Sequence, residues 1–382
     1  MQLNNFDKNI FLRDYWQQKP LLIKNPWHEW SNPLAPDELA GLACEEDVEA
    51  RLVMQQREQW KLEHGPFAET RFAKLSKKNW TLLVQAVDHH VPEVAVLLDQ
   101  FRFIPNWRID DVMVSYAADQ GGVGPHFDQY DVFLIQGLGR RRWQVGALCD
   151  HTTPLLPHDD LRLLAEFESK TEYLLEPGDM LYLPPRYAHN GIAVGDDCIT
   201  YSIGFRAPAQ NELIAHWCDH ILADLSDDDR YSDARISPQQ NPGEIAPAAL
   251  TELQRMATEK LLDYDIFQRW FGQFSTTRKY VDHDLQPAKK IKPAQLRARL
   301  AQGEILLRNM ASRFAFIRSH HEVLLFVDGE MFACPQTTAA FAERICAQQR
   351  IALMADMVES PEIMELLATL YNQGSLVLEH DD

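Results

Sequence analysis

The chain has 382 residues, of which 46% are hydrophobic and 24% are charged, a composition that is ordinary for a globular protein of two or three domains. It has no apolar run of about eighteen residues and no basic segment followed by an apolar one at its start, so we expect neither a membrane span nor secretion, and a cytoplasmic location. The formal net charge of −19 disfavours direct binding to nucleic acid and favours a basic partner, and the acidic excess lies almost entirely before Thr276.

The first hundred residues combine short helical patterns with extended ones. The histidine pair His89-His90 lies among them, and its position favours a surface or capping role over metal binding. An extended segment is predicted at Pro20–Ile23, and helices are predicted at Asn5–Gln18, Pro36–Leu42, Asn79–Asp88 and Val94–Leu98.

Between Asp111 and Phe205, short β-rich runs alternate with turns made of Gly, Pro and Asp. This spacing predicts an antiparallel double-sheet barrel. One short helix, at Asp159–Phe167, is expected to interrupt the barrel. We expect the barrel core, at about residues 100–206, to form a first domain over residues 1–208 together with the segment that precedes it.

A glycine-rich turn that ends at Pro125 leads into His126 and Asp128, which precede the apolar run Val132–Ile135. Residues two apart on an extended strand point to the same side, so an imidazole and a carboxylate are offered together. They make two thirds of the two-histidine-one-carboxylate set that suits non-haem Fe(II). The pattern therefore predicts part of a metal site.

His189 is the candidate for the third ligand. A Pro-Gly-Asp turn ending at Asp179 leads into a short strand, the pair Pro184-Pro185 ends that strand, and His189 opens the next extended segment. A β-barrel with inward-facing side chains brings ligands from different strands together in this way. The alternative is a core histidine whose nitrogens are satisfied by hydrogen bonds, and the turn-strand-turn frame favours the metal ligand.

Other residues offer rival metal sites. The pattern His-x-Asp recurs at His158, in a polar turn, and at His380, at the C-terminus. His216 and His220 are four apart on one predicted helix face, but Trp217 stands where a metalloprotease helix needs glutamate. The 6 cysteines are scattered without a Cys-x-x-Cys pair, which indicates reduced thiols and argues against a zinc finger.

Helical patterns replace the β-rich pattern after Pro208. Asn211–Leu225 carries an apolar stripe at helical spacing, and a long amphipathic helix pattern runs from Ala246 to Phe274 with several aromatic residues. We expect these helices to form a second region over residues 209–275. An aromatic stripe of this kind is usually core or a subunit contact.

The last hundred residues have the pattern of a small winged-helix unit, expected over residues 276–382. Its basic cluster around Lys289 could meet RNA, but a solvated face is the favoured interpretation because the unit is nearly neutral. Its predicted helices are Pro293–Gln302, Thr337–Gln348 and Pro361–Leu370, and its predicted strands are Arg313–Arg318, Glu322–Phe326 and Leu376–Leu378, with a turn at Asp328-Gly329.

Several motifs together resemble a known family. Gly178, Pro184 and His189 match the second half of the cupin pattern, although Arg186 stands where a cupin usually has glycine. His126, Asp128 and His189 resemble the metal set of JmjC-type 2-oxoglutarate oxygenases. The bacterial ribosomal oxygenases, which hydroxylate an arginyl residue of the sixteenth large-subunit ribosomal protein, are resembled by four segments: Phe11–Ile23 (FLRDYWQQKPLLI), Gln129–Phe133 (QYDVF), Gln136–Trp143 (QGLGRRRW) and Tyr201–Pro208 (YSIGFRAP).

This resemblance implies a β-rich α+β fold, namely a double-stranded β-helix of the jelly-roll or JmjC cupin type, followed by a helical dimerisation region and a C-terminal winged-helix domain. It also implies an Fe(II)- and 2-oxoglutarate-dependent dioxygenase that uses O2 and hydroxylates an arginine of a basic large-subunit ribosomal protein. In the resembling family the middle helices mediate homodimerisation, so we expect a homodimer.

The same resemblance assigns roles to single residues. Three protein ligands leave three of six positions on Fe(II), two for the keto and C1-carboxylate oxygens of 2-oxoglutarate and one for O2. Arg141 resembles the cation that binds the distal carboxylate of the cosubstrate; the alternative is that Arg140, Arg141 and Arg142 all decorate the barrel exterior. Ser115 is a further candidate for the cosubstrate pocket. Asp119 resembles a residue that holds the substrate guanidinium, and the alternative is a turn-stabilising aspartate.

Two other functions stay open from the sequence. One is a JmjC lysine demethylase, which shares the first steps but releases formaldehyde from a methylated lysine. The other is a non-catalytic cupin that acts as an interaction module. The mass change of a peptide substrate and the formation of succinate distinguish these two functions from each other and from the arginine hydroxylase.

Overall fold

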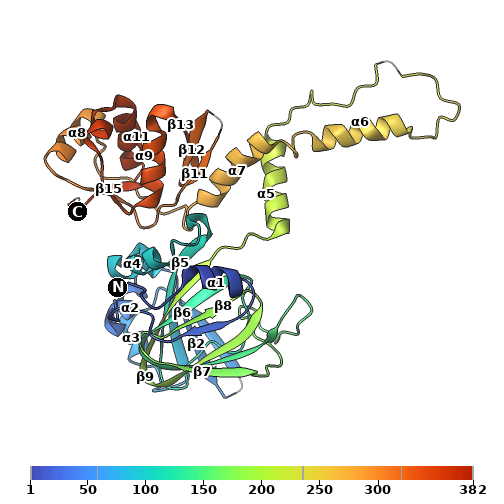
Figure 1. Ribbon diagram of the computed structural model, residues 1–382. Coiled ribbons are helices and arrows are strands. Elements are labelled where there is room, and N and C mark those ends of the chain that lie inside the picture. Colours follow the sequence, from blue (N-terminus) through green and yellow to red (C-terminus); the bar gives the residue numbers. More distant parts are fainter. Residues whose placement is uncertain (1, 58, 235, 320, 381–382) are drawn as a thin grey trace. The chain divides into compact units, whose positions relative to one another are not determined.

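The computed structural model describes residues 2–57, 59–234, 236–319 and 321–380. The chain divides into two compact units, residues 1–207 and residues 208–382. Each unit has a hydrophobic core of its own. Figure 1 colours the ribbon along the sequence, so the first unit runs from blue to green and the second from green to red.

The first unit is built on a nine-stranded sheet of antiparallel pairs in the order β1-β8-β6-β9-β5-β4-β2-β3, with β7 also paired to β6. The strands are β1 (Leu21–Ile23), β2 (Ala50–Gln56), β3 (Gln59–His64), β4 (Trp80–Val84), β5 (Ile109–Ala117), β6 (Asp131–Leu148), β7 (Thr171–Leu175), β8 (Met180–Leu183) and β9 (Tyr187–Phe205).

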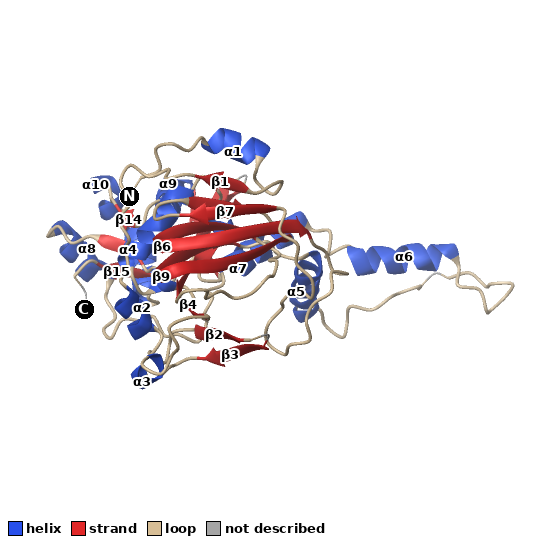
Figure 2. Cartoon of the chain, turned by 90° about the horizontal axis from the view of Figure 1, so that it is seen from below, coloured by secondary structure: helices blue, strands red, loops and turns tan. Residues whose placement is uncertain are grey.

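The sheet folds over into two layers, and the long strands β6 and β9 run through both of them. They run side by side in Figure 2, and their pairing shifts register between Gln136 and Leu138 and between Leu138 and Arg140. Bulges bend a strand pair locally. As a result, residues from the two ends of β6 meet in one buried apolar cluster: Val132 and Leu134 with Trp143 and Val145. The sheet thus folds over to enclose an interior.

Short helices cover the face of the sheet opposite to that apolar cluster and complete the main core of the first unit. Phe11 of α1 is 1% exposed and packs its ring against those of Phe133 and Tyr182. The Asp7 side chain caps α1 by accepting hydrogen bonds from two backbone N–H groups of its first turn. The helices are α1 (Lys8–Asp14), α2 (Pro36–Leu42), α3 (Glu69–Phe72), α4 (Pro92–Leu98) and the single turns η1 (Val87–His89), η2 (Asp99–Phe101) and η3 (Asn106–Arg108).

The helix expected at Asn79–Asp88 is wrong. Trp80–Val84 is strand β4, which pairs with β2 on one side and β5 on the other, and Val87–His89 is a single 3-10 turn. Residues 81–84 are all buried, so this strand is buried on both faces. Periodicity alone does not separate a strand of that kind from a buried helix.

The helix expected at Asp159–Phe167 is also wrong. Leu155 forms an isolated bridge with Leu164, and the Leu156 N–H donates to the Leu163 carbonyl at 2.8 Å. Leu164 belongs to a small apolar cluster with Cys149 and Ala188. The packing of adjacent leucines against the barrel therefore outweighs the local helical propensity.

The second unit begins with three helices, α5 (Gln210–Ala223), α6 (Pro247–Thr258) and α7 (Tyr264–Thr276). The single long helix expected at Ala246–Phe274 is thus two helices. The Asp263 side chain caps α7 by accepting a hydrogen bond from the Ile266 N–H at 3.0 Å, which starts a new helix. Trp217 and Ile221 of α5 pack with Trp270 of α7. By contrast, no residue of α6, all of which is described by the structure, is buried.

The rest of the second unit has the predicted winged-helix elements, together with short strands and a helix that the sequence did not predict. Asp328 and Gly329 form the turn between β12 and β13. The elements are α8 (Pro293–Ala301), β10 (Leu306–Arg308), β11 (Phe314–Arg318), β12 (Glu322–Val327), β13 (Glu330–Pro335), α9 (Gln336–Ala347), β14 (Arg350–Ile351), α10 (Ala355–Glu359), α11 (Pro361–Asn372) and β15 (Leu376–Leu378).

Two expectations from composition concern the whole chain. Among the residues that the structure describes, no helix combines the length and the apolar character that crossing a bilayer requires. The six cysteines form no disulfide with one another.

Candidate metal centre

The three predicted metal ligands are brought together by backbone pairing at the start of two strands. His126 and His189 form an isolated antiparallel bridge, in which each backbone N–H donates to the other residue's carbonyl, at 3.0 and 2.8 Å. The Asp128 carbonyl accepts from the Arg186 N–H at 2.6 Å, so the turn before His189 is tied to the same segment. The spacing of the ligands therefore follows from main-chain hydrogen bonds.

The side chains of these residues converge. The ligand atoms of His126, Asp128 and His189 all lie within 4.8 Å of one another. An Asp128 carboxylate oxygen lies 4.0 Å from His126 Nε2 and 3.6 Å from His189 Nε2. Two imidazoles and one carboxylate on a common face are the donor set that non-haem Fe(II) sites use, so these residues fit such an ion.

The two imidazole rings are held by hydrogen bonds on their far side. His126 Nδ1 lies 2.8 Å from the Gly124 carbonyl oxygen, and His189 Nδ1 lies 2.9 Å from the Tyr187 carbonyl oxygen. A carbonyl only accepts, so each Nδ1 carries the proton and each Nε2 keeps its lone pair. Partners of this kind fix the tautomer and orientation of metal-binding histidines.

Burial sets the charge of His189. Its side chain is 4% exposed, and its pKa is lowered from 6.5 to about 4, first by burial and then by the nearby His126, with Asp128 acting in the opposite sense. His189 is therefore neutral near pH 7, which is the state in which an imidazole binds a metal.

The three neighbouring arginines of β6 differ in their surroundings. Arg141 is 4% exposed, whereas Arg140 is exposed and Arg142 is half-buried beside Glu172, so the exterior alternative is wrong for Arg141. Arg141 Nε lies 3.4 Å from Cys198 Sγ, and Arg141 Nη2 has no hydrogen-bond partner among the described residues. A buried guanidinium with an unused donor is able to bind a carboxylate.

Ser115 and Asp119 lie at different depths. Ser115 is 2% exposed, and its hydroxyl donates to the Thr200 carbonyl at 3.4 Å. Asp119 is more accessible; its carboxylate accepts from the Gly195 N–H at 3.0 Å and from the Gln120 side chain at 3.2 Å, which lowers its pKa. These contacts fix a loop, and the substrate role of Asp119 and the cosubstrate role of Ser115 stay predictions.

The rival histidines have other partners. His158 Nδ1 accepts from the backbone N–H groups of Asp160 and Leu161, both at 3.1 Å, which is turn-capping chemistry. His216 lies against the Phe274 ring in a tilted arrangement, and His220 stacks on the Trp217 ring. In the ranges that the structure describes, His126, Asp128 and His189 are the one group of three or more such residues that could hold a metal ion.

Sequence reasoning missed Tyr130 and the side chains around Arg141. Tyr130 is 44% exposed, yet burial raises the pKa of its hydroxyl, and the carboxylates of Asp128 and Asp111 raise it further. Tyr130 follows Asp128 by two residues, just before β6, in the segment Gln129–Phe133 that carries the resemblance. Gln136 opens the segment Gln136–Trp143 that carries the resemblance, but no local signal predicted its contact with Cys198, because that contact joins different strands.

An antiparallel double-sheet barrel that carries two histidines and an aspartate around one point defines the class of cupin-type metal enzymes. A family model described as a JmjC domain matches residues 96–213, and one described as a ROXA-like winged helix matches residues 259–377. The chain is 38% identical over 368 residues to the ribosomal protein uL16 3-hydroxylase of Escherichia coli, with 95% of both chains covered. It therefore belongs to the JmjC ribosomal oxygenase family.

Other relatives agree with this family. The chain is 41% identical over 271 residues to a probable ribosomal oxygenase of Haemophilus influenzae, which covers 69% of this chain and 66% of the relative. The crystal structure of E. coli YcfD has a TM-score of 0.90 at 36% identity and covers 99% of this chain and 100% of the other. A structure of E. coli YcfD with cobalt and 2-oxoglutarate has a TM-score of 0.87 at 36% identity, with 99% of both chains covered. These matches confirm the expected fold class.

Proposed function

We propose that this chain is a 2-oxoglutarate-dependent oxygenase that hydroxylates an arginine side chain of the ribosomal protein uL16. The observation that carries the proposal is the convergence of His126, Asp128 and His189 within 4.8 Å of one another. The relative that covers 95% of the chain is a uL16 3-hydroxylase, and the YcfD structures include complexes with cobalt and 2-oxoglutarate. In this enzyme the metal is Fe(II), for which cobalt is a common substitute.

Different side chains of the site bind the metal ion and the cosubstrate. Fe(II), when bound with 2-oxoglutarate and O2, supplies an oxidant strong enough to hydroxylate an unactivated carbon. His126, Asp128 and His189 would hold the ion, each through one ligand atom. Arg141 binds the distal carboxylate of 2-oxoglutarate, with Ser115 in the same buried interior. Both residues are nearly excluded from solvent, which strengthens these contacts.

The substrate is a basic protein segment. The net charge of −19 attracts such a segment. We assign Tyr130 to the wall of the arginine pocket because its exposed ring lies beside Asp111 and Asp128, and we keep Asp119 as a second contact. Because ribosomal proteins are made in the cytoplasm, the enzyme acts there.

The experiment that tests this function measures the mass of a uL16 peptide after incubation with Fe(II), 2-oxoglutarate and the enzyme. The wild-type chain adds one oxygen to an arginine and forms succinate. Asp128→Ala lowers both rates by more than about a hundredfold, since the site loses its one carboxylate ligand.

The matched control is Asp160→Ala, which removes the aspartate of the second His-x-Asp pattern, in an exposed turn, and leaves both rates unchanged. Unchanged oxidation in the Asp128 variant contradicts the metal assignment. Formaldehyde release from a methylated lysine peptide, without oxygen addition to arginine, points to a demethylase instead.

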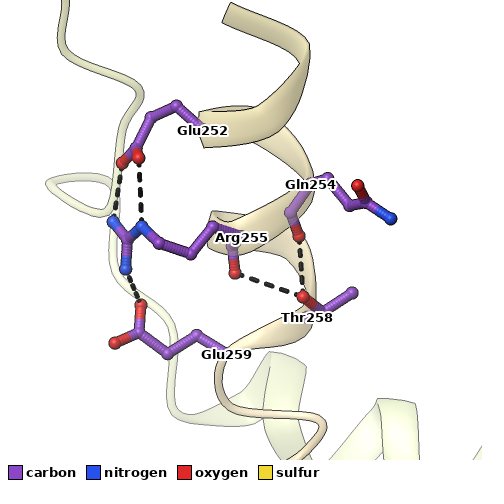
Figure 3. Close-up of polar contacts among 5 residues, drawn as sticks. All are labelled: Glu252, Gln254, Arg255, Thr258 and Glu259. Carbon is purple, nitrogen blue, oxygen red and sulfur yellow. Dashed lines mark hydrogen bonds and ion pairs between the residues drawn. The ribbon is translucent and has the colours of Figure 1, made fainter. Parts of the chain in front are cut away.

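We propose further that α6 takes part in a homodimer contact. Leu250 and Leu253 are 55% and 42% exposed and lie three residues apart, on one face of the helix. Figure 3 shows Arg255 of α6 between Glu252 and Glu259, and helical spacing puts Arg255 on a different side of the helix from Leu250 and Leu253. A helix with one charged and one apolar face normally buries the apolar face against another surface. A second copy of this chain has the same apolar face, so two copies can bury these faces against each other.

A further inference from the structure

The Arg141 guanidinium is held from one side by sulfur. Its Nε lies 3.4 Å from Cys198 Sγ, and both residues are buried, with Arg141 4% and Cys198 0% exposed. Arg141 Nη2 has no hydrogen-bond partner among the described residues. The donor nearest the chain is therefore engaged, while a donor at the far end of the guanidinium is available to an anion.

Gln136 holds Cys198 in place. The Gln136 amide nitrogen donates to Cys198 Sγ at 3.4 Å, and also to the carbonyls of Leu138 at 2.7 Å and Ile199 at 3.1 Å. The Gln136 amide oxygen accepts from the Thr200 hydroxyl at 3.2 Å. Gln136 is fully buried and sits at the register shift of β6, so a network across two strands fixes the sulfur.

Small side chains surround the same point. Cys198 packs with Ala117 and Ala193, and all three are 0% exposed. Ala193 lies directly opposite Arg141 in the pairing of β6 with β9. Alanines offer no polar side-chain group, so among the described residues of this cluster the sulfur is the polar partner of the guanidinium, whose Cζ also lies 5.7 Å from the centre of the Trp143 ring. The orientation of Arg141 therefore depends on Cys198 more than on any neighbour in this cluster.

We propose that Cys198, held by Gln136, is a positioning residue that orients the Arg141 guanidinium toward the distal carboxylate of 2-oxoglutarate. This inference rests on the proposed function, because it assumes that Arg141 binds that carboxylate. An arginine side chain has several rotatable bonds, and fixing it before binding reduces the entropy that the ligand must otherwise overcome. The thiol does not touch the cosubstrate and takes no part in the chemistry.

Calorimetric titration of the Co(II)-loaded full chain tests the proposal without turnover. The two ligands are 2-oxoglutarate and 2-oxopentanoate, which is similar in length and has a methyl group in place of the distal carboxylate. Cys198→Ala raises the Kd for 2-oxoglutarate about tenfold and leaves the Kd for 2-oxopentanoate unchanged, because the loss concerns the carboxylate contact alone. Cys198→Ser keeps an acceptor and restores most of the affinity.

The control is Cys149→Ala, which removes another buried thiol of the same unit, in a cluster with Leu164, and leaves both affinities unchanged. An equal loss for both ligands in Cys198→Ala, or no loss for either, overturns the positioning role. A thermal unfolding curve for each variant shows that it is folded. If Cys198→Ala does not fold, Cys198→Ser decides the question. A Kd for 2-oxoglutarate near the wild-type value then supports the proposal, and equal losses of affinity for both ligands overturn it.

Arg141→Ala separates this inference from the proposed function. If that variant binds 2-oxoglutarate as the wild type does, the cosubstrate assignment of Arg141 fails and the positioning role fails with it. If Arg141→Ala loses affinity while Cys198→Ala does not, the positioning role alone is wrong.

Discussion

At the scale of single residues, burial decides the properties of the site. His189 and Arg141 are both almost completely buried, yet their environments act in different ways. Burial keeps the His189 imidazole neutral and able to bind a metal, with a pKa of about 4. A guanidinium stays charged when it is buried, so Arg141 retains its affinity for an anion. One interior thus provides both a metal ligand and an anion contact.

The lowered pKa of His189 predicts how the stability of the metal-free protein depends on pH. The folded state binds this proton only near pH 4, whereas the unfolded state binds it near pH 6.5, so the unfolded state holds more protons between these values. The free energy of unfolding therefore falls as the pH decreases from 6.5 to 4, by about 1.4 kcal/mol per pH unit. Urea unfolding in the presence of a chelator, at pH 7 and pH 5, measures this change.

His189→Leu removes most of that pH dependence, and His151→Leu, which changes an exposed histidine, keeps it. An unaltered pH profile in the His189 variant would mean that another group carries the effect.

At the scale of elements, helix α6 and strand β6 differ in whether the rest of the chain buries their apolar residues. The charges of α6 are satisfied within the helix, because Arg255 pairs with Glu252 and Glu259. Exposed ion pairs of this kind contribute little to stability. The rest of the described chain does not bury the apolar side of the helix, since no α6 residue is buried. In β6, by contrast, residues from both halves of the strand are buried, because the bulges fold it over one cluster.

A substitution on each face of α6 separates these roles. Leu253→Glu places a charge on the apolar face and shifts the protein from dimer to monomer, because the association would bury that charge. Sedimentation velocity at micromolar concentration measures the shift. Arg255→Gln, on the charged face, leaves the dimer unchanged. If the Leu253 variant sediments as a dimer, α6 is not the contact.

At the scale of the whole molecule, the two units have separate cores, and the proposed chemistry belongs to the first. The second unit depends on a close approach of helix to sheet: a Cβ added at Gly272 of α7 would lie 2.3 Å from the Phe326 ring of β12. Glycine is required there for packing. Gly41 of α2, in the first unit, has no atom within 4 Å of the same added position.

These two glycines predict opposite effects of the same substitution. Gly272→Ala lowers the stability of the second unit by about 1–3 kcal/mol, because overpacking displaces the helix. Gly41→Ala is neutral or stabilises the first unit by about 0.5–1 kcal/mol, because alanine favours the helix. Thermal unfolding followed by calorimetry, with Co(II) binding as a second measurement, resolves the units. Loss of Co(II) binding in Gly272→Ala contradicts separate folding.

Much of the site could be predicted from the sequence because its signals are local. His126 and Asp128 are two apart in the segment that leads into β6, and His189 follows a turn-strand-turn frame that Gly178 and Pro184 mark. The helices with clear starts, such as Pro36–Leu42, were predicted at their observed bounds. Cap residues and strand alternation act over a few positions, so they can be recognised without knowledge of the fold.

Tertiary structure alone decided the features that depend on distant partners. Trp80–Val84 became a strand because β2 and β5 lie on both sides of it, and the helix expected at Asp159–Phe167 gave way to packing against the barrel. The contact of Arg141 with Cys198, and of Cys198 with Gln136, exists only through the register of β6 on β9. Register is set by the summed packing of whole strands, and the free energy of that packing belongs to no single stretch of the chain.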